Sequence, residues 1–368
     1  MDVVFILSSI INPNSIKRVN EFVNRGYNVQ VYGFDRLLSI ANKPDKVEII
    51  PIGIVNNSSN YFSRCKVYIK GIKRVLRDTK TKNCIYFVIG FDVMIYFKFL
   101  SCKKYIYEEP DLVYANSEGV ITKFFGYIDR FFIKHSLLTV FRSEGFIKFH
   151  YNCNPPINIR TIANRLNKNI LKLNRIEKKQ LDITNLQIGF VGLIRYQSIF
   201  KFAEIFCKNF PQHTFHFYGT FGSDIIEVKY NNLRKYTNCV FHGPFTSPGD
   251  LPEIYSNLDL LLSTYDVSNI NVRYAEPNKI YEAIYFETPI IVSNGTFLSE
   301  KVFDWGIGYS VDALDEKSVV NLVKKLSIES IKEKIDNIQK IPKDRVLNIN
   351  DAFFNDLEKF GIGPNLKI

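Results

Sequence analysis

The stretch LQIGFVGLIRYQSIFKFAEIFCKNFPQHTFHFYG, residues 186–219, decides the fold of this 368-residue chain. An apolar run of strand length, Leu186–Val191, ends at Gly192, and the segment at about 198–209 places its apolar residues at helical spacing. A second apolar strand, Thr214–Tyr218, ends at another glycine, Gly219. A strand, a helix and a strand in this order are typical of a βαβ unit, from which parallel sheets are built.

The same alternation of short apolar runs and amphipathic segments continues on both sides of this unit. A polar stretch rich in Lys and Asn separates two halves that each show the strand–helix pattern. We therefore expect an α/β protein with two doubly wound, Rossmann-like domains that face a central cleft. The expected parts are an N-terminal domain over 1–165, a linker over 166–185, a C-terminal domain over 186–345, and over 346–368 a helix that could pack back on the first domain.

The composition is that of a folded protein. Hydrophobic residues make up 46% and charged residues 23%, which is too apolar for a disordered chain. No uninterrupted apolar run reaches the ~18 residues of a membrane span. The run Val3–Leu7 follows Asp2 rather than a basic segment, so we expect a buried strand there and not a signal peptide. The six cysteines form no C-x-x-C pair, which argues against a disulfide scaffold or a zinc ribbon and favours a cytoplasmic protein.

The net charge of +11 belongs to one half of the chain. Residues 1–165 carry 24 basic and 13 acidic side chains, whereas residues 166–368 carry 24 of each. Such an asymmetry indicates either a solvated basic face or an anionic partner for the first half, such as lipid headgroups, a phosphate-bearing ligand or nucleic acid. No DNA- or RNA-binding motif accompanies the charge, so nucleic acid is not an expected partner.

Two basic segments of the first half have apolar residues at helical spacing. Residues 64–77 set six Lys or Arg among apolar side chains, and residues 123–134 form a Phe-rich stretch with basic residues between the aromatics. A basic amphipathic helix can lie on anionic lipid, at the inner face of the cell membrane. The same pattern also fits a helix with an apolar core face and solvated cations. We favour core packing for 123–134 and leave both interpretations open for 64–77.

A second stretch, YAEPNKIYEAIYFETPIIVS (residues 274–293), carries candidate chemistry. Pro277 suits the first turn of a helix, whose opening amides near Asn278 and Lys279 would form an anion site together with the Lys279 ammonium. Glu282 follows about one turn later. This pattern suits a nucleoside diphosphate, because amides and a lysine can hold the phosphates while a carboxylate holds the ribose hydroxyls. An ordinary Lys279–Glu282 pair on a helix surface explains the pattern equally well.

The segment Phe190–Tyr196 adds an arginine. A strand ends at Gly192, which lets a ligand approach the backbone, and Arg195 follows three residues later and can bind a diphosphate through two hydrogen bonds. An exposed arginine after a strand is common, so this segment alone is a weak signal.

Taken in chain order, these segments resemble the GT-B glycosyltransferases, in particular the bacterial polysaccharide and capsule enzymes of that fold. The resemblance covers about 186–310 well and is looser in the first half. It rests on Gly192–Arg195, on Tyr218-Gly219 with Val240–Gly243, on Leu251–Leu260 and on Pro277–Glu282.

The resemblance implies a donor site for a nucleotide-diphosphate sugar in the second half. Arg195 and Lys279 would hold the diphosphate, Glu282 the ribose, and the loops at Gly219 and Phe245 would lie near the base. The expected donor-binding residues are Gly192, Arg195, Gly219, Phe245, Asn278, Lys279 and Glu282.

One position departs from the family pattern. Many retaining members carry two glutamates separated by seven residues, but the first of these positions is Tyr274 here, and Glu276 lies only six residues before Glu282. This puts a retaining reaction in doubt. An inverting reaction needs a base from the first domain, where Glu108 and Asp111 follow the predicted strand Tyr105–Tyr107 and suit the deprotonation of a hydroxyl. We favour Asp111; the alternative is a solvated acidic turn.

No metal site and no cofactor are expected. His213 and His216 have no carboxylate or cysteine partner in the sequence pattern, and His135, His150 and His242 are isolated. The loop Ser8–Ser15 lacks the G-x-G-x-x-G dinucleotide fingerprint, and there is no Walker A motif.

The favoured function is therefore a metal-independent glycosyltransferase of the hexosyltransferase type. It would move a sugar from a nucleotide-diphosphate sugar to a hydroxyl of a glycan acceptor, lipid-linked, in surface polysaccharide synthesis. A nucleotide-sugar epimerase of the same fold is an alternative, although it has no need of a basic first half. The other alternative is a non-catalytic nucleotide-binding or scaffold protein, which would have no need to keep Arg195, Lys279 and Glu282.

Overall fold

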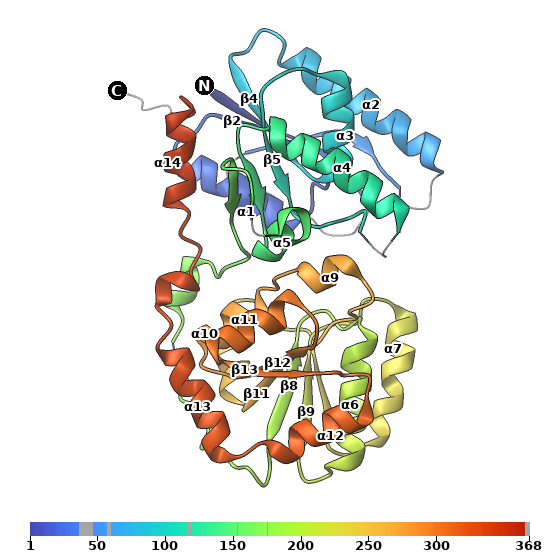
Figure 1. Ribbon diagram of the computed structural model, residues 1–368, viewed down its shortest axis with the longest axis vertical. Helices are drawn as coiled ribbons and strands as arrows, with labels where there is room; N and C mark the ends of the chain where they lie inside the picture. Colours follow the sequence, from blue (N-terminus) through green and yellow to red (C-terminus); the bar gives the residue numbers. More distant parts are fainter. Residues whose placement is uncertain (37–46, 57–59, 116–118, 153, 175, 365–368) are drawn as a thin grey trace. The chain divides into compact units, whose positions relative to one another are not determined.

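The computed structural model describes residues 1–36, 47–56, 60–115, 119–152, 154–174 and 176–364, in two compact units (Figure 1). Unit 1 comprises Met1–Ile162 and Asn350–Ile368, and unit 2 comprises Ala163–Ile349. Each unit contains one parallel β-sheet with helices packed on it, the doubly wound α/β architecture expected from the sequence.

Unit 1 is built on a seven-stranded sheet in the order β3-β2-β1-β4-β5-β6-β7. The central strand β1 pairs in parallel with β2 and β4, and Phe5 lies opposite Val31 on one side and Phe87 on the other. Because both faces of the sheet are covered, β1 and β4 are almost continuous apolar runs. The strands are β1 (Asp2–Leu7), β2 (Val29–Asp35), β3 (Ile49–Ile54), β4 (Cys84–Ile89), β5 (Tyr105–Glu109), β6 (Thr139–Phe141) and β7 (Ile159–Thr161).

Helices cover both faces of this sheet. The Asn12 side chain caps α1 by accepting hydrogen bonds from the amides of Asn14 (3.0 Å) and Ser15 (3.1 Å). The C-terminal helix α14 packs beside α1, with the rings of Phe22 and Phe354 5.0 Å apart, while right-handed crossovers put α2, α3 and α4 side by side on the opposite face (Figure 1). The helices are α1 (Pro13–Asn24), α2 (Tyr61–Asp78), α3 (Phe91–Leu100), α4 (Val120–His135), α5 (Glu144–Tyr151) and α14 (Asp351–Lys359).

Unit 2 repeats the plan with a six-stranded parallel sheet in the order β10-β9-β8-β11-β12-β13. One apolar cluster lies under α6 and α12, and a second lies under α8, α10 and α11. The strands are β8 (Gln187–Val191), β9 (Thr214–Tyr218), β10 (Cys239–Gly243), β11 (Leu260–Ser263), β12 (Ile290–Ser293) and β13 (Gly308–Val311). The α-helices are α6 (Gln197–Asn209), α7 (Asp224–Asn231), α8 (Leu251–Ser256), α9 (Ile270–Tyr274), α10 (Lys279–Tyr285), α11 (Phe297–Trp305), α12 (Glu316–Lys325) and α13 (Ile328–Gln339).

The segment 166–185, for which the sequence predicts a linker, belongs to unit 2 instead. Ile170 is buried in the cluster under α10, and its carbonyl accepts a hydrogen bond from the Tyr285 hydroxyl (3.1 Å). Further along, the Lys178 ammonium donates to the Leu258 carbonyl (3.0 Å) and to the Thr288 hydroxyl (2.6 Å). These contacts anchor a polar-looking stretch that composition alone assigns to a linker.

None of the helices in the described part of the chain is long and apolar enough to cross a membrane.

Candidate functional site

Three glycines end neighbouring strands at the carboxyl edge of the unit 2 sheet. The amide of Gly192, after β8, donates to the Tyr218 carbonyl (2.8 Å), and the amide of Gly219, after β9, donates to the carbonyl of Gly243, which ends β10 (2.7 Å). A Cβ atom at Gly219 would lie only 2.0 Å from the Gly192 carbonyl oxygen, and the φ of Gly219 is +139°. Only glycine fits there, so the backbones of the three loop starts lie close together and open to a ligand.

Lys279 reaches this edge from the start of α10. A Cβ atom at Gly192 would lie 2.9 Å from the Lys279 Nζ, so the ammonium sits directly against the backbone at the end of β8. The Nζ also lies 4.9 Å from the centroid of the Phe190 ring. Among the described residues, no carboxylate forms an ion pair with Lys279. Lys279, predicted from the sequence to bind a diphosphate, thus lies at the strand ends beside Gly192.

Arg195 lies in the loop that follows Gly192. Its guanidinium donates to the Tyr196 hydroxyl (2.8 Å) and stacks on the Tyr196 ring at 4.8 Å, and the side chain is exposed. Ile194 bridges to Phe221, and Gly222 packs against the Arg195 Cβ atom, so this loop is paired with the loop after β9. Arg195 thus lies on the same edge of the sheet as the three glycines.

Glu282 lies in α10 and is buried. One of its carboxylate oxygens accepts a hydrogen bond from the hydroxyl of Tyr255 in α8 (2.7 Å). Burial raises the pKa of Glu282, while the Lys279 charge and the Tyr255 hydrogen bond oppose that rise. Asn278, the residue before α10, is exposed, and Phe245 packs against the cluster under α10. Sequence reasoning missed Tyr255, because no spacing links residues on two different helices.

The N-termini of the helices near this edge differ from what we expected from the sequence. Pro277 lies before α10, which begins at Lys279 and has only seven residues. The start of α6 is occupied from within the chain, since the Asp266 carboxylate accepts hydrogen bonds from the amides of Gln197 (3.1 Å) and Ser198 (2.8 Å). The anion-binding potential of this edge therefore rests mainly on side-chain cations and on the glycine backbones.

Glu276 lies two residues after Tyr274, the position where the family pattern has a glutamate, and its carboxylate makes contacts within the protein. It is buried, its carboxylate pairs with the Lys301 ammonium (2.7 Å), and it accepts a hydrogen bond from the Tyr281 hydroxyl. These contacts fix the loop before α10 to α11. Glu276 therefore does not replace the glutamate that is absent at Tyr274.

Glu108, one of the two candidate bases, is buried at the end of β5 in unit 1. Its carboxylate accepts hydrogen bonds from Arg18 Nε (3.0 Å) and Arg142 Nε (2.8 Å). Although burial alone would raise its pKa, the two guanidinium groups hold the pKa of Glu108 below its usual range. A carboxylate in this position is a poor proton acceptor, and the geometry gives it a structural role.

Asp111, the other candidate base, is exposed in the loop after β5. Its carbonyl accepts a hydrogen bond from the Val113 amide (2.9 Å), and the intervening Leu112 is fully buried. The loop is thus anchored directly after Asp111, which is exposed.

Two histidines expected to be isolated have titratable neighbours. The ring of His242 lies 3.0 Å from His216, measured between Nε2 and Nδ1, and His150 Nε2 lies 3.1 Å from a carboxylate oxygen of Glu109. Both pairs join residues from different elements, which explains why their spacing in the sequence gave no signal.

Comparison of the fold with solved structures identifies its type. The chain aligns with Anabaena HepE in complex with UDP and glucose at a TM-score of 0.68 and 13% identity, covering 98% of this chain and 99% of that one. It aligns with the lipopolysaccharide outer core galactosyltransferase WaaB at 0.67 and 14% identity, covering 98% and 100%. It aligns with sucrose-phosphate synthase from Thermosynechococcus elongatus at 0.67 and 12% identity, covering 98% of each chain.

No protein-family model and no curated protein sequence matches the chain. At 11–14% identity the structural matches speak for the fold alone. They extend over both units, since 98% of this chain is covered. The expectation drawn from the sequence is confirmed: this chain has the two-domain α/β fold of the GT-B glycosyltransferases.

Proposed function

We propose that the protein is a glycosyltransferase of the hexosyltransferase type that uses a nucleoside-diphosphate sugar as donor. The acceptor is a hydroxyl of a glycan, carried on a lipid, in surface polysaccharide synthesis. Similar folds support the donor class, since HepE has been solved with UDP and with UDP-glucose. The site within unit 2 supplies the chemical argument.

The observation that carries the proposal is the Lys279 ammonium held against the backbone of Gly192 at the carboxyl ends of the strands. In the transfer, the acceptor oxygen bonds to the anomeric carbon while the bond from that carbon to the β-phosphate oxygen breaks. The nucleoside diphosphate leaves with the bonding electrons, and Lys279 and Arg195 stabilise the negative charge that develops on it. Because these two cations do this work, we expect the donor site to need no metal ion.

Calorimetric titration with UDP, GDP, dTDP and the matching nucleosides tests the donor class, in buffer with EDTA and again with Mg²⁺. We expect one nucleoside diphosphate to bind in both buffers and its nucleoside to bind at least about 100-fold more weakly, because the diphosphate contacts are lost. Absence of binding by all the diphosphates would leave the non-catalytic scaffold as the better description.

Glu282 is proposed to bind the ribose hydroxyls. The variant Glu282→Ala should weaken UDP binding and remove the preference for UDP over 2′-deoxy-UDP, whereas the affinity for inorganic pyrophosphate should not change. If the variant keeps the same preference for UDP, Glu282 does not contact the ribose.

Asp111 is proposed as the base that takes the proton of the acceptor hydroxyl. The variant Asp111→Asn should bind the donor nucleotide as the wild type does and lose at least about 100-fold in transfer rate, a normal loss when a general base is removed. An unchanged rate would exclude Asp111 from the reaction.

An epimerase would instead convert the donor sugar without any acceptor, and product analysis by NMR separates that outcome.

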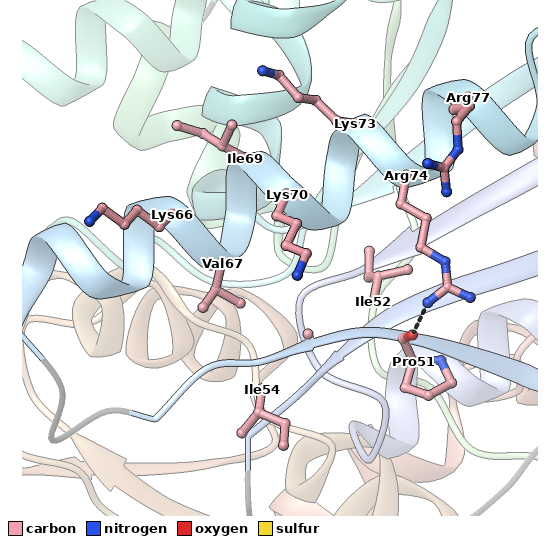
Figure 2. Close-up of a pocket in the computed structure, with 11 residues that line it drawn as sticks. Pro51, Ile52, Ile54, Lys66, Val67, Ile69, Lys70, Lys73, Arg74 and Arg77 are labelled. Carbon is pink, nitrogen blue, oxygen red and sulfur yellow. Dashed lines mark hydrogen bonds between the residues drawn. The ribbon is translucent and has the colours of Figure 1, made fainter.

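The basic first half is proposed to dock on an anionic membrane at the inner face of the cell membrane. A groove of about 830 Å³ runs between α2 and the edge strand β3, with Ile52, Ile54 and Val67 among its apolar walls. Figure 2 shows Lys66, Lys70 and Lys73 along the same helix, and no ion pair involves them in the part of the chain described. Charge complementarity to anionic headgroups, with exposed Tyr61 and Phe62 at the helix start, supports lipid as the partner.

The helix α4 adds apolar side chains to this side of unit 1. Core packing was the favoured interpretation of 123–134, and it is right only in part. Phe132 and Ile133 are buried, whereas Phe124 and Tyr127 are 58% and 70% exposed. The exposed residues follow helical spacing, which gives α4 an apolar face next to the α2–α3 pair.

Vesicle flotation tests the docking. Wild-type protein should float with vesicles that contain phosphatidylglycerol and not with pure phosphatidylcholine, and high salt should release it. The triple variant K66Q/K70Q/K73Q should lose this binding, whereas K317Q/K324Q/K325Q, on exposed positions of α12 in unit 2, should keep it. Equal binding by both triple variants would contradict a role for α2.

A further inference from the structure

Three ionisable side chains from different elements meet inside unit 1. Glu109 ends β5, Asp129 comes from α4 and His150 from α5, and all three are buried. Each residue offers one possible metal-ligand atom, and these three atoms lie within 4.8 Å of one another. His150 Nε2 lies 3.1 Å from a Glu109 carboxylate oxygen and 3.6 Å from an Asp129 carboxylate oxygen. The cluster is separate from the proposed donor site, which lies in unit 2.

In the part of the chain that the structure describes, no basic side chain compensates the charge of this cluster. Within the described residues, no Lys or Arg makes an ion pair with Glu109 or Asp129, whereas the adjacent Glu108 has two arginines. Glu109 Oε1 and His150 Nδ1 are buried without a hydrogen-bond partner. Two buried carboxylates in this state are costly unless a cation or bound protons balance them. Orphaned buried polar atoms of this kind can mark an ion site.

The geometry favours a metal ion as the balancing cation. Ligand atoms bound to one ion at about 2.0–2.1 Å lie about 3–3.4 Å apart in octahedral or tetrahedral arrangements. The observed separations of 3.1 and 3.6 Å are close to that range. Two carboxylates and an imidazole form a ligand set suited to Zn²⁺, Mn²⁺ or Fe²⁺.

Outer hydrogen bonds orient one ligand of this set. The hydroxyls of Tyr107 and Tyr114 each donate to a carboxylate oxygen of Asp129, both at 2.9 Å. The His150 ring stacks on Phe141 at 5.5 Å, which fixes its plane. Supporting contacts of this kind are typical of protein metal sites.

We propose that Glu109, Asp129 and His150 bind one divalent transition-metal ion, of the zinc class, which joins β5, α4 and α5. The ion has a structural role. It would hold the end of β5 immediately before Pro110 and Asp111, and so fix the loop that carries the proposed base. The proposal stands independently of the donor site, because it concerns metal content and stability rather than nucleotide binding.

The competing description is a metal-free cluster that holds extra protons. In that state, burial raises the pKa of Glu109 to about 8 and holds the pKa of Asp129 well above its usual range, while burial lowers the pKa of His150 to about 4. The two descriptions differ in a measurable quantity, the number of metal ions retained per chain.

The test measures metal content of the full chain after expression and after incubation with Zn²⁺, Mn²⁺ or Co²⁺ and gel filtration. We expect about one retained ion per chain, a higher Tm in its presence, and for Co²⁺ the visible absorption of a low-symmetry site. Less than a tenth of an equivalent with every metal, and no change in Tm, would overturn the proposal.

Variants locate the ion. H150Q and E109Q should lose the retained metal and its effect on Tm. The double variant H216Q/H242Q removes the partly exposed histidine pair of unit 2 and should keep the metal; loss of the metal there alone would place the ion at that pair and overturn the proposal. If H150Q does not fold, the Co²⁺ spectrum of the wild type compared with that of H216Q/H242Q still decides between the two sites.

Discussion

The carboxyl edges of the two sheets use charge in opposite ways. In unit 1 the charged groups at the ends of β5 and β6 face one another, and Glu108 lies between Arg18 and Arg142 with almost no exposure. In unit 2 the edge holds Lys279 and Arg195, and neither pairs with a carboxylate in the described structure. The charge of Glu108 is neutralised from within the protein, whereas Lys279 and Arg195 have no such ion pair among the described residues.

This difference distinguishes charged side chains that stabilise the fold from charged side chains that remain available to bind a ligand. A buried ion pair fixes the ends of strands and has little affinity left for a substrate. A lysine held against the backbone of Gly192, without a carboxylate in an ion pair among the described residues, has a charge that phosphate oxygens can approach. The comparison therefore supports the proposed nucleotide site in unit 2 and the proposed role of the exposed Asp111 in unit 1.

The largest expected effect is on the folding of unit 1. The variant E108Q removes the carboxylate that two buried guanidinium groups share, so that Arg18 keeps only its pair with Glu21, and it should lower the free energy of unfolding by about 3–5 kcal/mol. Urea denaturation measures this. The matched control D78N breaks the exposed pairs with Arg74 and Arg77 and should change stability by less than about 1 kcal/mol. A stable E108Q protein that has lost transfer activity would instead make Glu108 catalytic and remove the contrast between the edges.

A smaller effect is expected on ligand binding in unit 2. The variant K279M keeps the apolar stem of the side chain and removes the ammonium, so nucleoside diphosphate binding should weaken by about 10–150-fold, or about 1.5–3 kcal/mol. The control K201M removes a lysine of α6 that pairs with Glu204 (2.7 Å) and should bind as the wild type does. Equal affinities of K279M and K201M in calorimetry would show that the unpaired charge does not serve the diphosphate.

We expect a histidine pair in the unit 2 sheet to make the folded protein less stable at acid pH. Burial, together with His242 and Lys179, lowers the pKa of His216 to about 4, below the 6.5 of an ordinary histidine. Between pH 4 and pH 6.5 the unfolded chain therefore binds more protons at this histidine than the folded protein does. The stability that the folded protein has above pH 6.5 is lost as the pH falls toward 4. The full shift corresponds to about 3 kcal/mol, which solvent screening reduces to on the order of 1–2 kcal/mol.

Urea unfolding of H216Q at pH 7 and at pH 4.5 measures this contribution. The glutamine can keep hydrogen bonds to Gln187 and His242 without titrating, so the variant should lose less stability on acidification than the wild type. H135Q, at the exposed end of α4, should show the wild-type pH dependence. If H135Q and H216Q behave alike, the pair in unit 2 does not govern acid stability.

The sequence predicted those helices and strands whose pattern of apolar residues lies within one short stretch of the chain. The strand–glycine–helix order correctly located β8, α6 and β9, and it brought Gly192, Gly219 and Lys279 to one edge because parallel strands end on the same side. The edge strand β3 was missed, since Pro51 and Gly53 interrupt its apolar pattern. The helix α3 was also missed, because it is apolar on nearly all sides and shows no helical period.

The side-chain pairs could not be predicted for a different reason. Asp266 caps α6 from 69 residues away along the chain, and Glu109 meets a histidine 41 residues further on. Such contacts depend on how the helices pack on the sheets. The ion pairs of Glu108 with Arg18 and Arg142 could not be predicted either, because the three residues come from distant parts of the chain.

The smallest expected effect concerns how Glu282 is held in unit 2. The Tyr255 hydroxyl donates to the Glu282 carboxylate, so Y255F leaves a buried carboxylate with one donor fewer. Affinity for UDP should fall about 3–10-fold, the value of about one hydrogen bond, while affinity for 2′-deoxy-UDP should fall less. The control Y285F removes a hydroxyl of the same helix that bonds to the Ile170 carbonyl and should leave both affinities unchanged. Equal losses for the two nucleotides would mean that Tyr255 supports the fold of α10 rather than the position of the carboxylate, and the open edge would then depend on Lys279 and Arg195 alone.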